Sequence, residues 1–275
     1  MSEKRQPPPP KRDQRAKNKF SGNHQRSWLW GHHAVLETLA TGVWPIHEIV
    51  SSANAFKQSS EVLAAKQAAG IPLEIVDSER LQQLTGSSEH QGLAVRLGPF
   101  PYQSLDSLST RVQSSSPSDN VPLVVICDRL QDAFNFGAIL RCCDGVNVTA
   151  VIIGDHAQAD VTPHVVRSSS GAVNHLSIVK VSSLIETVQR LKQLGFQIVA
   201  ADANTDTGLW SAKLTQPTAL IIGSEATGVQ SELLAACDLR LWIPMLGRVS
   251  SLNAAVAAGI LLYEIRRQQH TLSKT

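Results

Sequence analysis

The 275-residue sequence has few cysteines, few aromatic residues and no long hydrophobic run. Its four cysteines include no C-x-x-C pair, which excludes a disulfide-stapled secreted domain and the common zinc sites and indicates reduced thiols. The longest apolar run, residues 254–263, is ten residues long, about half of the roughly 20 that a membrane-spanning helix needs. With 43% hydrophobic and 17% charged residues, the chain is expected to be a folded cytoplasmic protein without a membrane partner.

The net charge of +2 hides an uneven distribution along the chain. Residues 1–27 carry eight Lys or Arg and two Asp or Glu, a net charge of +6, so the rest of the chain carries −4. This segment contains four consecutive prolines and almost no apolar residue, which predicts a disordered basic tail. Its charge suits a phosphate-rich partner. A tail that only improves solubility is the alternative.

Residues 28–98 are predicted to form a small α/β domain. Helices are expected over 31–42, in the stretch ending at Gly70 and from Ser78 onwards, with strands over 46–50, 71–77 and 92–97. Two prolines and the serine-rich stretch that follow predict a linker over 99–120.

A second α/β domain is predicted over 121–275. Short apolar strands alternate there with helical stretches, which is typical of a parallel sheet covered on both faces. Ligands of such sheets bind at the carboxyl ends of the strands. The chemistry is therefore expected just after Asp128, Ile222 and Ile243.

Directly after the strand at 123–128, the segment NFGAILR combines a helix start with a glycine and an arginine four residues apart. Asn135 is predicted to cap the helix, and Gly137 and Arg141, four residues apart, share one face of it. The absent side chain of Gly137 leaves room for a ligand beside Arg141, and a helix N-terminus with a guanidinium favours an anion. A capped helix with a solvated arginine is the alternative.

The segment IIGSEATGV, residues 221–229, predicts a strand ending in a tight glycine loop that presents the carboxylate of Glu225. Val229 and Gln230 stand where a nucleotide P-loop requires Lys and Ser or Thr, which excludes a nucleoside triphosphatase. No G-x-G-x-x-G follows any strand. A Rossmann dehydrogenase and the common methyltransferase fold are therefore not expected.

The segment IPMLGRVSSLNAAVAAG, residues 243–259, predicts an irregular loop followed by the last helix. Ser250 or Ser251 is predicted to cap this helix. Four alanines and a glycine give the helix an unusually small-sided surface, which allows a neighbouring backbone to approach closely.

In order and spacing, these segments resemble the three signature motifs of the SpoU, or TrmH-like, RNA ribose 2′-O-methyltransferases of the SPOUT superfamily. The first motif, N-x-G-x-x-x-R, falls on Asn135, Gly137 and Arg141, and the second, G-x-E-x-x-G, on Gly223, Glu225 and Gly228. The third, I-P-M-x-G-x-x-x-S-L-N, matches at Ile243, Pro244, Met245, Gly247, Ser251, Leu252 and Asn253. Residues 31–42 and 90–95 resemble the substrate-binding domain of the two-domain, RlmB-like members. One departure is Phe134, where a histidine is common.

The resemblance implies a catalytic domain tied in a deep trefoil knot, S-adenosylmethionine as cofactor without a metal, and a homodimer. It implies that Gly223, Ile243, Met245 and Leu252 contact the cofactor. Asn135, Arg141, Glu225, Ser251 and Asn253 are the catalytic candidates. The implied reaction methylates a ribose 2′-hydroxyl, expected in a guanosine of large-subunit ribosomal RNA. A transfer-RNA target and a non-catalytic RNA-binding or assembly protein on the same fold remain the alternatives.

Arg141 is unsuited to act as a general base, because an arginine side chain is essentially always protonated. We expect it instead to bind the phosphate next to the target ribose and to stabilise developing negative charge. Asn135, Ser251 and Asn253 are then expected to orient the hydroxyl, while Glu225 braces either Arg141 or Asn135.

Overall fold

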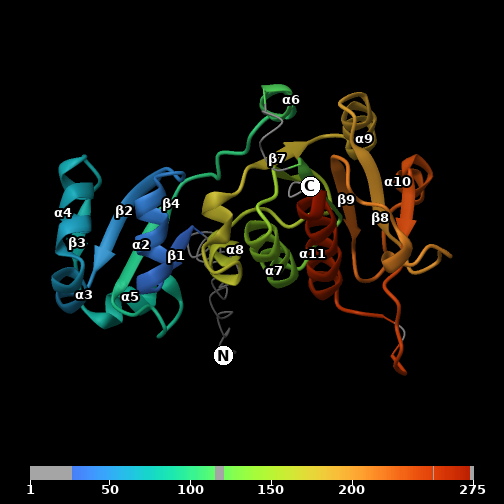
Figure 1. Ribbon diagram of the computed structural model, residues 1–275. Coiled ribbons are helices and arrows are strands. Elements are labelled where there is room, and N and C mark those ends of the chain that lie inside the picture. Colours follow the sequence, from blue (N-terminus) through green and yellow to red (C-terminus); the bar gives the residue numbers. More distant parts are fainter. Residues whose placement is uncertain (1–26, 115–120, 250, 273–275) are drawn as a thin grey trace, which may run out of the picture.

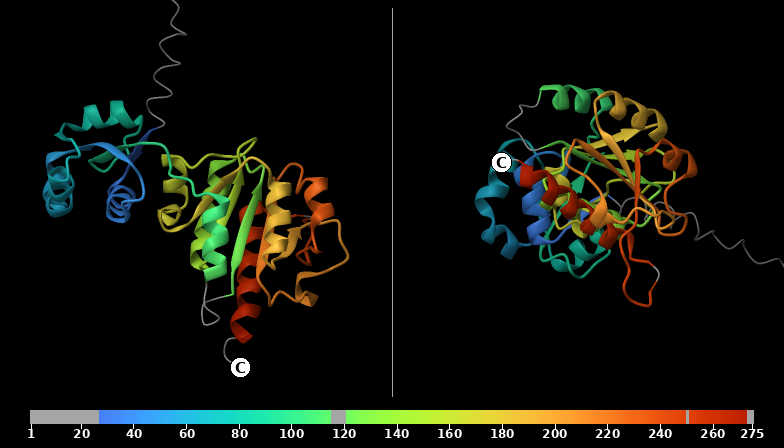
Figure 2. Two further views of the ribbon diagram at one scale, coloured as in Figure 1. Left: turned by 90° about the horizontal axis from the view of Figure 1, so that it is seen from above. Right: turned by 45° about the vertical axis from the view of Figure 1, so that its right-hand side comes forward.

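The chain folds around two β-sheets that lie side by side (Figures 1 and 2). The computed structural model describes residues 27–114, 121–249 and 251–272, so the predicted basic tail, apart from Ser27, lies outside the described residues. The first sheet has four strands in the order β1-β4-β2-β3, and the second has six in the order β10-β8-β9-β5-β6-β7. Helices accompany both sheets, as expected for the predicted α/β class.

The four-stranded sheet and its helices form the first domain. Its elements are β1 (Trp28–Trp30), α2 (His32–Thr41), β2 (Ile46–Ser51), α3 (Ala53–Gln58), α4 (Ser60–Ala68), β3 (Leu73–Ile75), α5 (Ser78–Thr85) and β4 (Leu93–Leu97). Helix α2 ends as predicted, because Gly42 adopts the left-handed conformation there. The sequence pattern misses β1 and α3, which are too short to display a period.

Part of the predicted linker over 99–120 is packed structure. The ring of Phe100 meets that of Trp44 edge-on, with 4.9 Å between the centroids. Helix α6 (Leu105–Ser114) follows, and its Leu108 is fully buried against the six-stranded sheet. Prolines and serines predict a loop here, whereas apolar residues at helical spacing bury one face of a helix, and the bounds of the linker stay a prediction.

The six-stranded sheet forms the core of the second domain. Its elements are β5 (Leu123–Asp128), α7 (Ala133–Gly145), β6 (Ala150–Gly154), α8 (Pro163–Ser168), η1 (Ala172–His175), β7 (Ile178–Val181), α9 (Leu184–Gln193), β8 (Gln197–Ala201), η2 (Leu209–Ser211), β9 (Thr218–Gly223), α10 (Ser231–Ala236), β10 (Leu239–Leu241) and α11 (Ala254–Leu272). Every pair of neighbouring strands is parallel, which confirms the prediction.

Helices cover both faces of this sheet, and the central strand β5 shows why. Leu123, Val125 and Cys127 belong to the apolar cluster shared with α7 and α11. The alternating residues Val124 and Ile126 belong to the cluster shared with α6, α9 and α10. Successive side chains of a strand point to opposite faces, so an uninterrupted apolar strand buries both.

The helix starts differ from the predicted ones. Asp132, not Asn135, caps α7, because its Oδ1 accepts a hydrogen bond from the Phe134 amide at 2.8 Å. Asn253 takes the capping role predicted for Ser251: its Oδ1 accepts from the Ala255 amide at 2.9 Å. Ser250, the other predicted cap, lies outside the described residues. Both caps are Asx side chains placed just before the first helical turn.

Gly137 permits contact between two helices rather than with a ligand. A Cβ atom at this position would lie 2.7 Å from the Cβ of Ser168 and 2.8 Å from its carbonyl carbon. Ser168 ends α8, and its hydroxyl donates to the carbonyl oxygen of Ala133 at 3.0 Å. The space that the sequence analysis assigned to a ligand is therefore filled by α8.

The last helix packs closely on α7, as its small side chains predict. A Cβ at Gly259 would lie 3.3 Å from Cys142 Sγ. Farther along α11, the buried Arg266 donates to the carbonyl oxygens of Val121, Val146 and Asn147, each at 2.9 Å. These contacts join α11 to both ends of the β5–α7 unit. The trefoil knot stays a prediction from the family resemblance.

Segment η1 links the two domains. The Oδ1 of the buried Asn174 accepts from Trp44 Nε1 at 3.0 Å, and its Nδ2 donates to Thr38 Oγ1 at 3.1 Å. His175 Nε2 and Glu37 Oε1 lie 3.0 Å apart. One apolar cluster contains buried residues from both sheets. The first domain is therefore docked on the second through specific polar contacts around an apolar core.

All four cysteines are free thiols. Burial raises the pKa of the Cys127 thiol to about 12 and that of Cys143 well above its usual value. These two thiols are inert at neutral pH. No helix among the described residues is both long and apolar enough to cross a membrane.

The contact of Gly137 with Ser168 yields a prediction for stability. In Gly137→Ala, overpacking costs about 1–3 kcal/mol, against a gain of about 1 kcal/mol in helix propensity, so the unfolding midpoint should fall by a few degrees. The matched control is Gly154→Ala, whose added Cβ would have no neighbour closer than 3.9 Å. Thermal unfolding followed by circular dichroism measures both. Equal midpoints for the two variants would contradict the assigned contact.

Candidate active site

Three segments far apart in the sequence meet where the strands of the large sheet end. They are the first turn of α7, the loop after β9, and the residues that precede α11. Glu225 Oε1 accepts a hydrogen bond from Asn135 Nδ2. Asn135 Oδ1 in turn accepts from Asn253 Nδ2 at 2.9 Å. The predicted residues Asn135, Glu225 and Asn253 therefore form one hydrogen-bonded relay.

The relay fixes the orientation of both amides. Because Asn253 Oδ1 accepts from the backbone amides at the start of α11, its Nδ2 must face Asn135. Asn135 then presents its oxygen to Asn253 and its nitrogen to Glu225. Each amide nitrogen retains one further hydrogen to donate to a ligand.

Arg141 lies farther along α7 and belongs to a different contact. Its Nη1 donates to Ser170 Oγ at 3.3 Å, beyond the end of α8. Of the two bracing roles expected for Glu225, the structure has the contact with Asn135. No carboxylate lies within ion-pair distance of Arg141 among the residues that the structure describes. Its guanidinium is exposed on the same helix that carries Asn135 of the relay.

A cavity of about 320 Å³ opens beside the relay, at the carboxyl ends of β8, β9 and β10. It is lined by all four residues predicted to contact a cofactor, and by two of the catalytic candidates. These are Gly223, Ile243, Met245 and Leu252, together with Glu225 and Ser251. The cavity has the size and the mixed apolar and polar lining of a small-molecule site.

Asp202 and Trp242 also line this cavity, and the motifs do not include them. Asp202 follows the strand β8, and Trp242 follows β10. The rule that ligands gather at the ends of parallel strands could have indicated both positions, but the sites expected from it follow Asp128, Ile222 and Ile243. Their neighbourhood in space depends on β8 lying between β9 and β10, an order that the sequence does not reveal.

Gly223 has to be glycine because the loop after β9 folds back on it. A Cβ atom there would overlap the backbone of Gly228 and Val229. The Gly228 amide donates to the carbonyl oxygen of Ser224 at 2.8 Å, which closes the loop. Ser224 Oγ also accepts from the Thr227 amide at 3.2 Å. This tight turn presents Glu225 to the relay.

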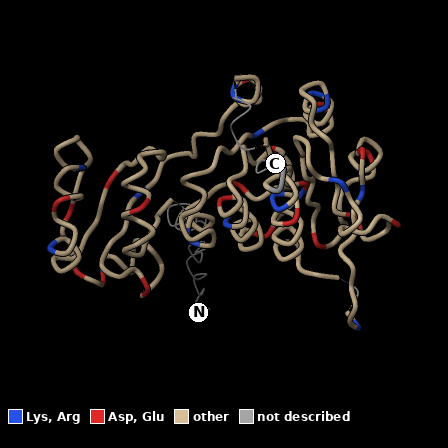
Figure 3. The backbone as a smooth tube through the Cα atoms, viewed as in Figure 1, with Lys and Arg blue, Asp and Glu red and all other residues tan. Residues whose placement is uncertain are grey.

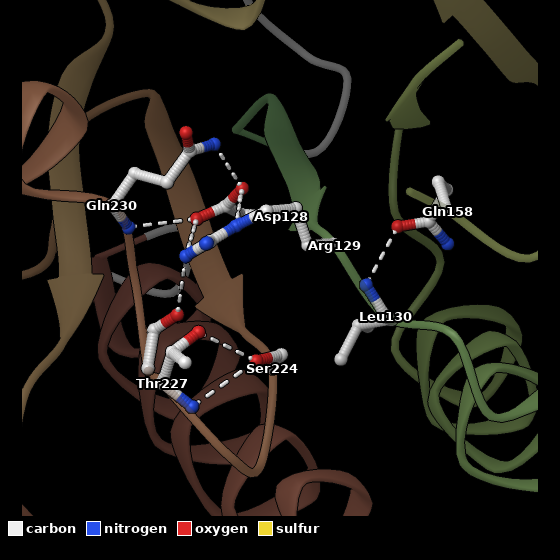
Figure 4. Close-up of polar contacts among 8 residues, drawn as sticks. Asp128, Arg129, Leu130, Gln158, Ser224, Thr227 and Gln230 are labelled. Carbon is white, nitrogen blue, oxygen red and sulfur yellow. Dashed lines mark hydrogen bonds and ion pairs between the residues drawn. The ribbon is translucent and has the colours of Figure 1, made fainter. Parts of the chain in front are cut away.

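A buried carboxylate holds the same loop from the other side (Figure 4). Asp128, the last residue of β5, has no exposed surface. Its Oδ2 accepts from the Gln230 amide at 2.7 Å, and its Oδ1 accepts from Gln230 Nε2 at 2.6 Å. Arg129 completes the clamp: its Nε donates to Asp128 Oδ1 at 3.1 Å and its Nη2 to the Gly228 carbonyl oxygen at 3.3 Å. Chemistry is expected just after Asp128 from the sequence, but no sequence pattern indicates this supporting role.

The fold and the motifs agree with two matches to known families. Residues 122–263 match the SpoU rRNA methylase family, and residues 28–103 match the substrate-binding domain of RNA 2′-O ribose methyltransferases. The chain belongs to the SpoU rRNA methylase family. It is therefore an RNA methyltransferase of the SpoU/TrmH type, in the two-domain form that the motifs suggested.

Individual family members support this assignment. A Staphylococcus aureus protein assigned to the TrmH family of tRNA/rRNA methyltransferases is 33% identical over 245 residues, covering 89% of this chain and 97% of the relative. The SpoU methyltransferase AviRb from Streptomyces viridochromogenes, solved in complex with its cofactor AdoMet, superposes with a TM-score of 0.73 at 26% identity and covers 95% of both chains. The A. aeolicus TrmH/SpoU tRNA modifying enzyme is 30% identical, with a TM-score of 0.51, and covers 61% of this chain and 85% of its own.

Among the described residues, no group of three or more His, Cys, Asp or Glu side chains is arranged to hold a metal ion. The relay consists of two amides and one carboxylate with the Arg141 guanidinium on the same helix, and Asp202 and Ser251 add a carboxylate and a hydroxyl to the cavity lining. Such groups bind, orient and stabilise charge rather than act as a ligand cage.

The clamp around Asp128 yields a prediction for loop dynamics. In Asp128→Ala, the backbone and side-chain amides of Gln230 lose two part-buried hydrogen bonds to a carboxylate, which should cost about 1.5–3 kcal/mol of unfolding free energy. Hydrogen exchange at the Gly228 and Gln230 amides should accelerate more than in the rest of the sheet. Asp155→Ala is the matched control, because that carboxylate directly follows the neighbouring strand β6 but pairs with an exposed His156. Unchanged exchange at Gln230 in Asp128→Ala would refute the clamp.

Proposed function

We propose that the protein transfers a methyl group from S-adenosylmethionine to a ribose 2′-hydroxyl of large-subunit ribosomal RNA, at a guanosine. The observation that carries the proposal is the relay of Asn135, Glu225 and Asn253 at the edge of the cavity. Hydrogen-bond donors there can orient a hydroxyl beside a bound small molecule. The proposal includes a cytoplasmic location, where ribosomal RNA is made available to a bacterial enzyme of this family.

The cavity suits S-adenosylmethionine in size and in lining. Leu241, Ile243 and Leu252 offer apolar contact, and Asp202 and Glu225 offer carboxylates to the cationic and hydroxyl-bearing parts of the molecule. Exposed backbone at the glycine loop supplies further donors and acceptors. The AdoMet complex of AviRb, which aligns along 95% of this chain, supports this assignment. When bound, S-adenosylmethionine supplies an electrophilic methyl group.

The residues of the chain then have two tasks. The first is to hold the 2′-oxygen in line with the methyl group, and the second is to stabilise the negative charge that develops on this oxygen as its proton leaves to bulk water. We assign orientation to Asn135, Ser251 and Asn253, whose amides and hydroxyl can donate and accept. Glu225 holds Asn135 in position. Arg141 binds the phosphate next to the target ribose, a task that suits its planar guanidinium.

Ribosomal RNA is favoured over transfer RNA by the docked first domain. That domain is matched to the substrate-binding domain of ribose methyltransferases. The tRNA modifying enzyme of A. aeolicus covers 61% of this chain, compared with 95% for AviRb. A transfer-RNA target is the second candidate, because the catalytic motifs do not distinguish the two. A non-catalytic RNA-binding protein is disfavoured, because every polar motif position is retained.

The basic tail is proposed to hold RNA non-specifically. The first domain is a poor electrostatic partner for RNA by itself: residues 27–98 contain four Lys or Arg and seven Asp or Glu, which are spread over its surface (Figure 3). The tail precedes this domain directly and carries a net charge of +6. Phosphate attraction therefore has to come largely from outside the first sheet.

A homodimer is also part of the proposal. Val256, Ile260 and Tyr263 of α11 are 51%, 40% and 59% exposed. They follow one another at helical spacing and form an apolar stripe on the outer face of the helix. A second copy of the chain would cover this stripe and bring two catalytic domains together next to α7.

The direct test is transfer of tritiated methyl groups from S-adenosylmethionine to ribosomal and transfer RNA that lack modifications. Primer extension at low nucleotide concentration then locates the 2′-O-methyl group. We expect incorporation into large-subunit ribosomal RNA at one guanosine. Incorporation into transfer RNA alone would favour the second candidate, and no incorporation into any RNA would favour the binding protein.

Arg141→Lys tests the assignment of this side chain. Lysine keeps the charge but loses the two-pronged geometry, so turnover should fall roughly 10- to 100-fold, corresponding to one or two charge-assisted hydrogen bonds. Cofactor binding, measured by calorimetry, should not change, because Arg141 does not line the cavity. Near-normal turnover would overturn the bidentate phosphate contact.

Deletion of residues 1–27 tests the tail. The plot of log binding constant against log salt concentration should become flatter by about 0.7 for each phosphate contact that is lost. Methyl transfer at saturating RNA should remain, since the relay is untouched. A variant with the eight Lys and Arg residues of the tail changed to Gln separates charge from chain length. An unchanged salt slope in both would assign the tail to solubility.

A further inference from the structure

An aromatic residue stands exposed beside the relay. Phe134 in the first turn of α7 is 64% exposed, although burying a phenylalanine ring is strongly favourable. Its ring meets the exposed His164 of α8 edge-on, with 4.4 Å between the centroids and an interplanar angle of 86°. The pair forms a preformed aromatic corner on the surface. Its immediate neighbour in the chain is Asn135, the central member of the relay.

A cation lies one helical turn farther along α8. Arg167 follows His164 by three residues, which places both on the same side of the helix. The guanidinium carbon of Arg167 lies 4.3 Å from the centroid of the Trp30 ring. This cation–π contact orients the guanidinium without neutralising it. Among the described residues, no carboxylate pairs with Arg167.

These groups follow a continuous path across the two domains. Helix α8 lies between β1 of the first domain and α7 of the second (Figure 1), and it contacts both. The path therefore runs from Trp30, at the end of β1, through Arg167 and His164 to Phe134. Arg141 lies seven residues after Phe134, which places it on the same side of α7. The described chain begins at Ser27, next to β1, where the basic tail joins.

We propose that this path, consisting of Trp30, Phe134, His164 and Arg167, binds the single-stranded RNA that flanks the target nucleotide. Unpaired bases stack on Phe134 and His164, and the backbone phosphate beside them contacts Arg167. The proposal rests on the proposed function, because it requires RNA as the substrate. It adds a second RNA contact to that of the relay. The relay holds the target ribose, and the path holds the nucleotides next to it.

Single-stranded RNA is the occupant that fits the chemistry of all four side chains. Unstacked bases are bound by aromatic rings and guanidinium planes, with cationic side chains along the backbone. A protein partner would favour apolar groups around Phe134, whereas its ring meets the imidazole of His164, and Arg167 follows one turn farther along α8. A rigid double helix offers no free base face to the corner.

The test measures binding of a fluorescein-labelled single-stranded RNA of about 12 nucleotides by anisotropy, with the full chain at fixed salt. Phe134→Ala should weaken binding about 5- to 100-fold, the effect of losing one stacked base. Phe134→Trp should retain it, because the larger ring also stacks. The matched control is Trp210→Ala: this aromatic residue is 70% exposed and lies in η2, which is remote in sequence from α7 and α8. It should bind as the wild type does.

Salt dependence separates stacking from charge. Phe134→Ala should leave the slope of log binding constant against log salt unchanged, because it removes no charge. Arg167→Ala should lower the magnitude of that slope by about 0.7, and Arg167→Lys should restore it. An RNA with one base removed at a series of positions provides a double-mutant cycle. At the stacking position, the losses of binding free energy caused by removing the base and by removing the Phe134 ring should not be additive.

Two further measurements make each outcome decisive. Cofactor binding by calorimetry and mass by analytical ultracentrifugation should be the same for Phe134→Ala and wild type, so a folding defect or a lost dimer contact would be seen. Wild-type binding by Phe134→Ala, or a lower mass of this variant, would overturn the path. If the wild type binds this RNA through Phe134 but methylates no RNA, the proposed function fails while the path stands.

Discussion

The hydrogen bonds that join Asn135, Glu225 and Asn253 are the interaction on which the site depends. The three residues come from the start of one helix, a loop after a strand and the cap of the last helix, and 90 and 118 residues of chain separate the bonded pairs. A primary amide has one acceptor and one donor end, so each bond determines the direction of the next. The relay therefore requires the three segments to be in place together, and it reports the correct assembly of the whole domain.

Close backbone approach makes that assembly possible. Glycine at 223 allows the loop to fold back on the end of β9, and glycine at 137 allows α8 to lie against α7. The buried carboxylate of Asp128 then secures the loop by accepting from Gln230 twice. Small residues bring the backbones together, and a fully satisfied buried charge keeps them in one arrangement. The polar site is thus supported by the close packing of backbone segments at Gly137 and Gly223.

Docking of the two domains extends this order beyond the catalytic sheet. Asn174 is buried between Trp44 and Thr38, with both ends of its amide satisfied by the first domain. The neighbouring Ser170 accepts from Arg141. The same short stretch of chain therefore touches the substrate-binding domain on one side and the candidate phosphate-binding arginine on the other. An RNA bound across both domains would meet a surface on which the relative position of the two domains is already fixed.

The sequence by itself determined the parallel α/β class, the two-domain order and the residues of the three motifs, because strand periodicity and motif spacing are local properties. It placed Asn135 at one helix cap and Ser250 or Ser251 at the other, whereas Asp132 and Asn253 take these roles. Several Asx and Ser residues near a helix start compete for the cap, and tertiary hydrogen bonds decide between them. The sequence predicted that a ligand fills the space beside Gly137, whereas Ser168 of α8 fills it in the structure. Only the tertiary structure decided that Glu225 braces Asn135, that Asp128 clamps the glycine loop, and that Asp202 joins the cavity. Those contacts depend on strand order and on long-range packing, which no local pattern encodes.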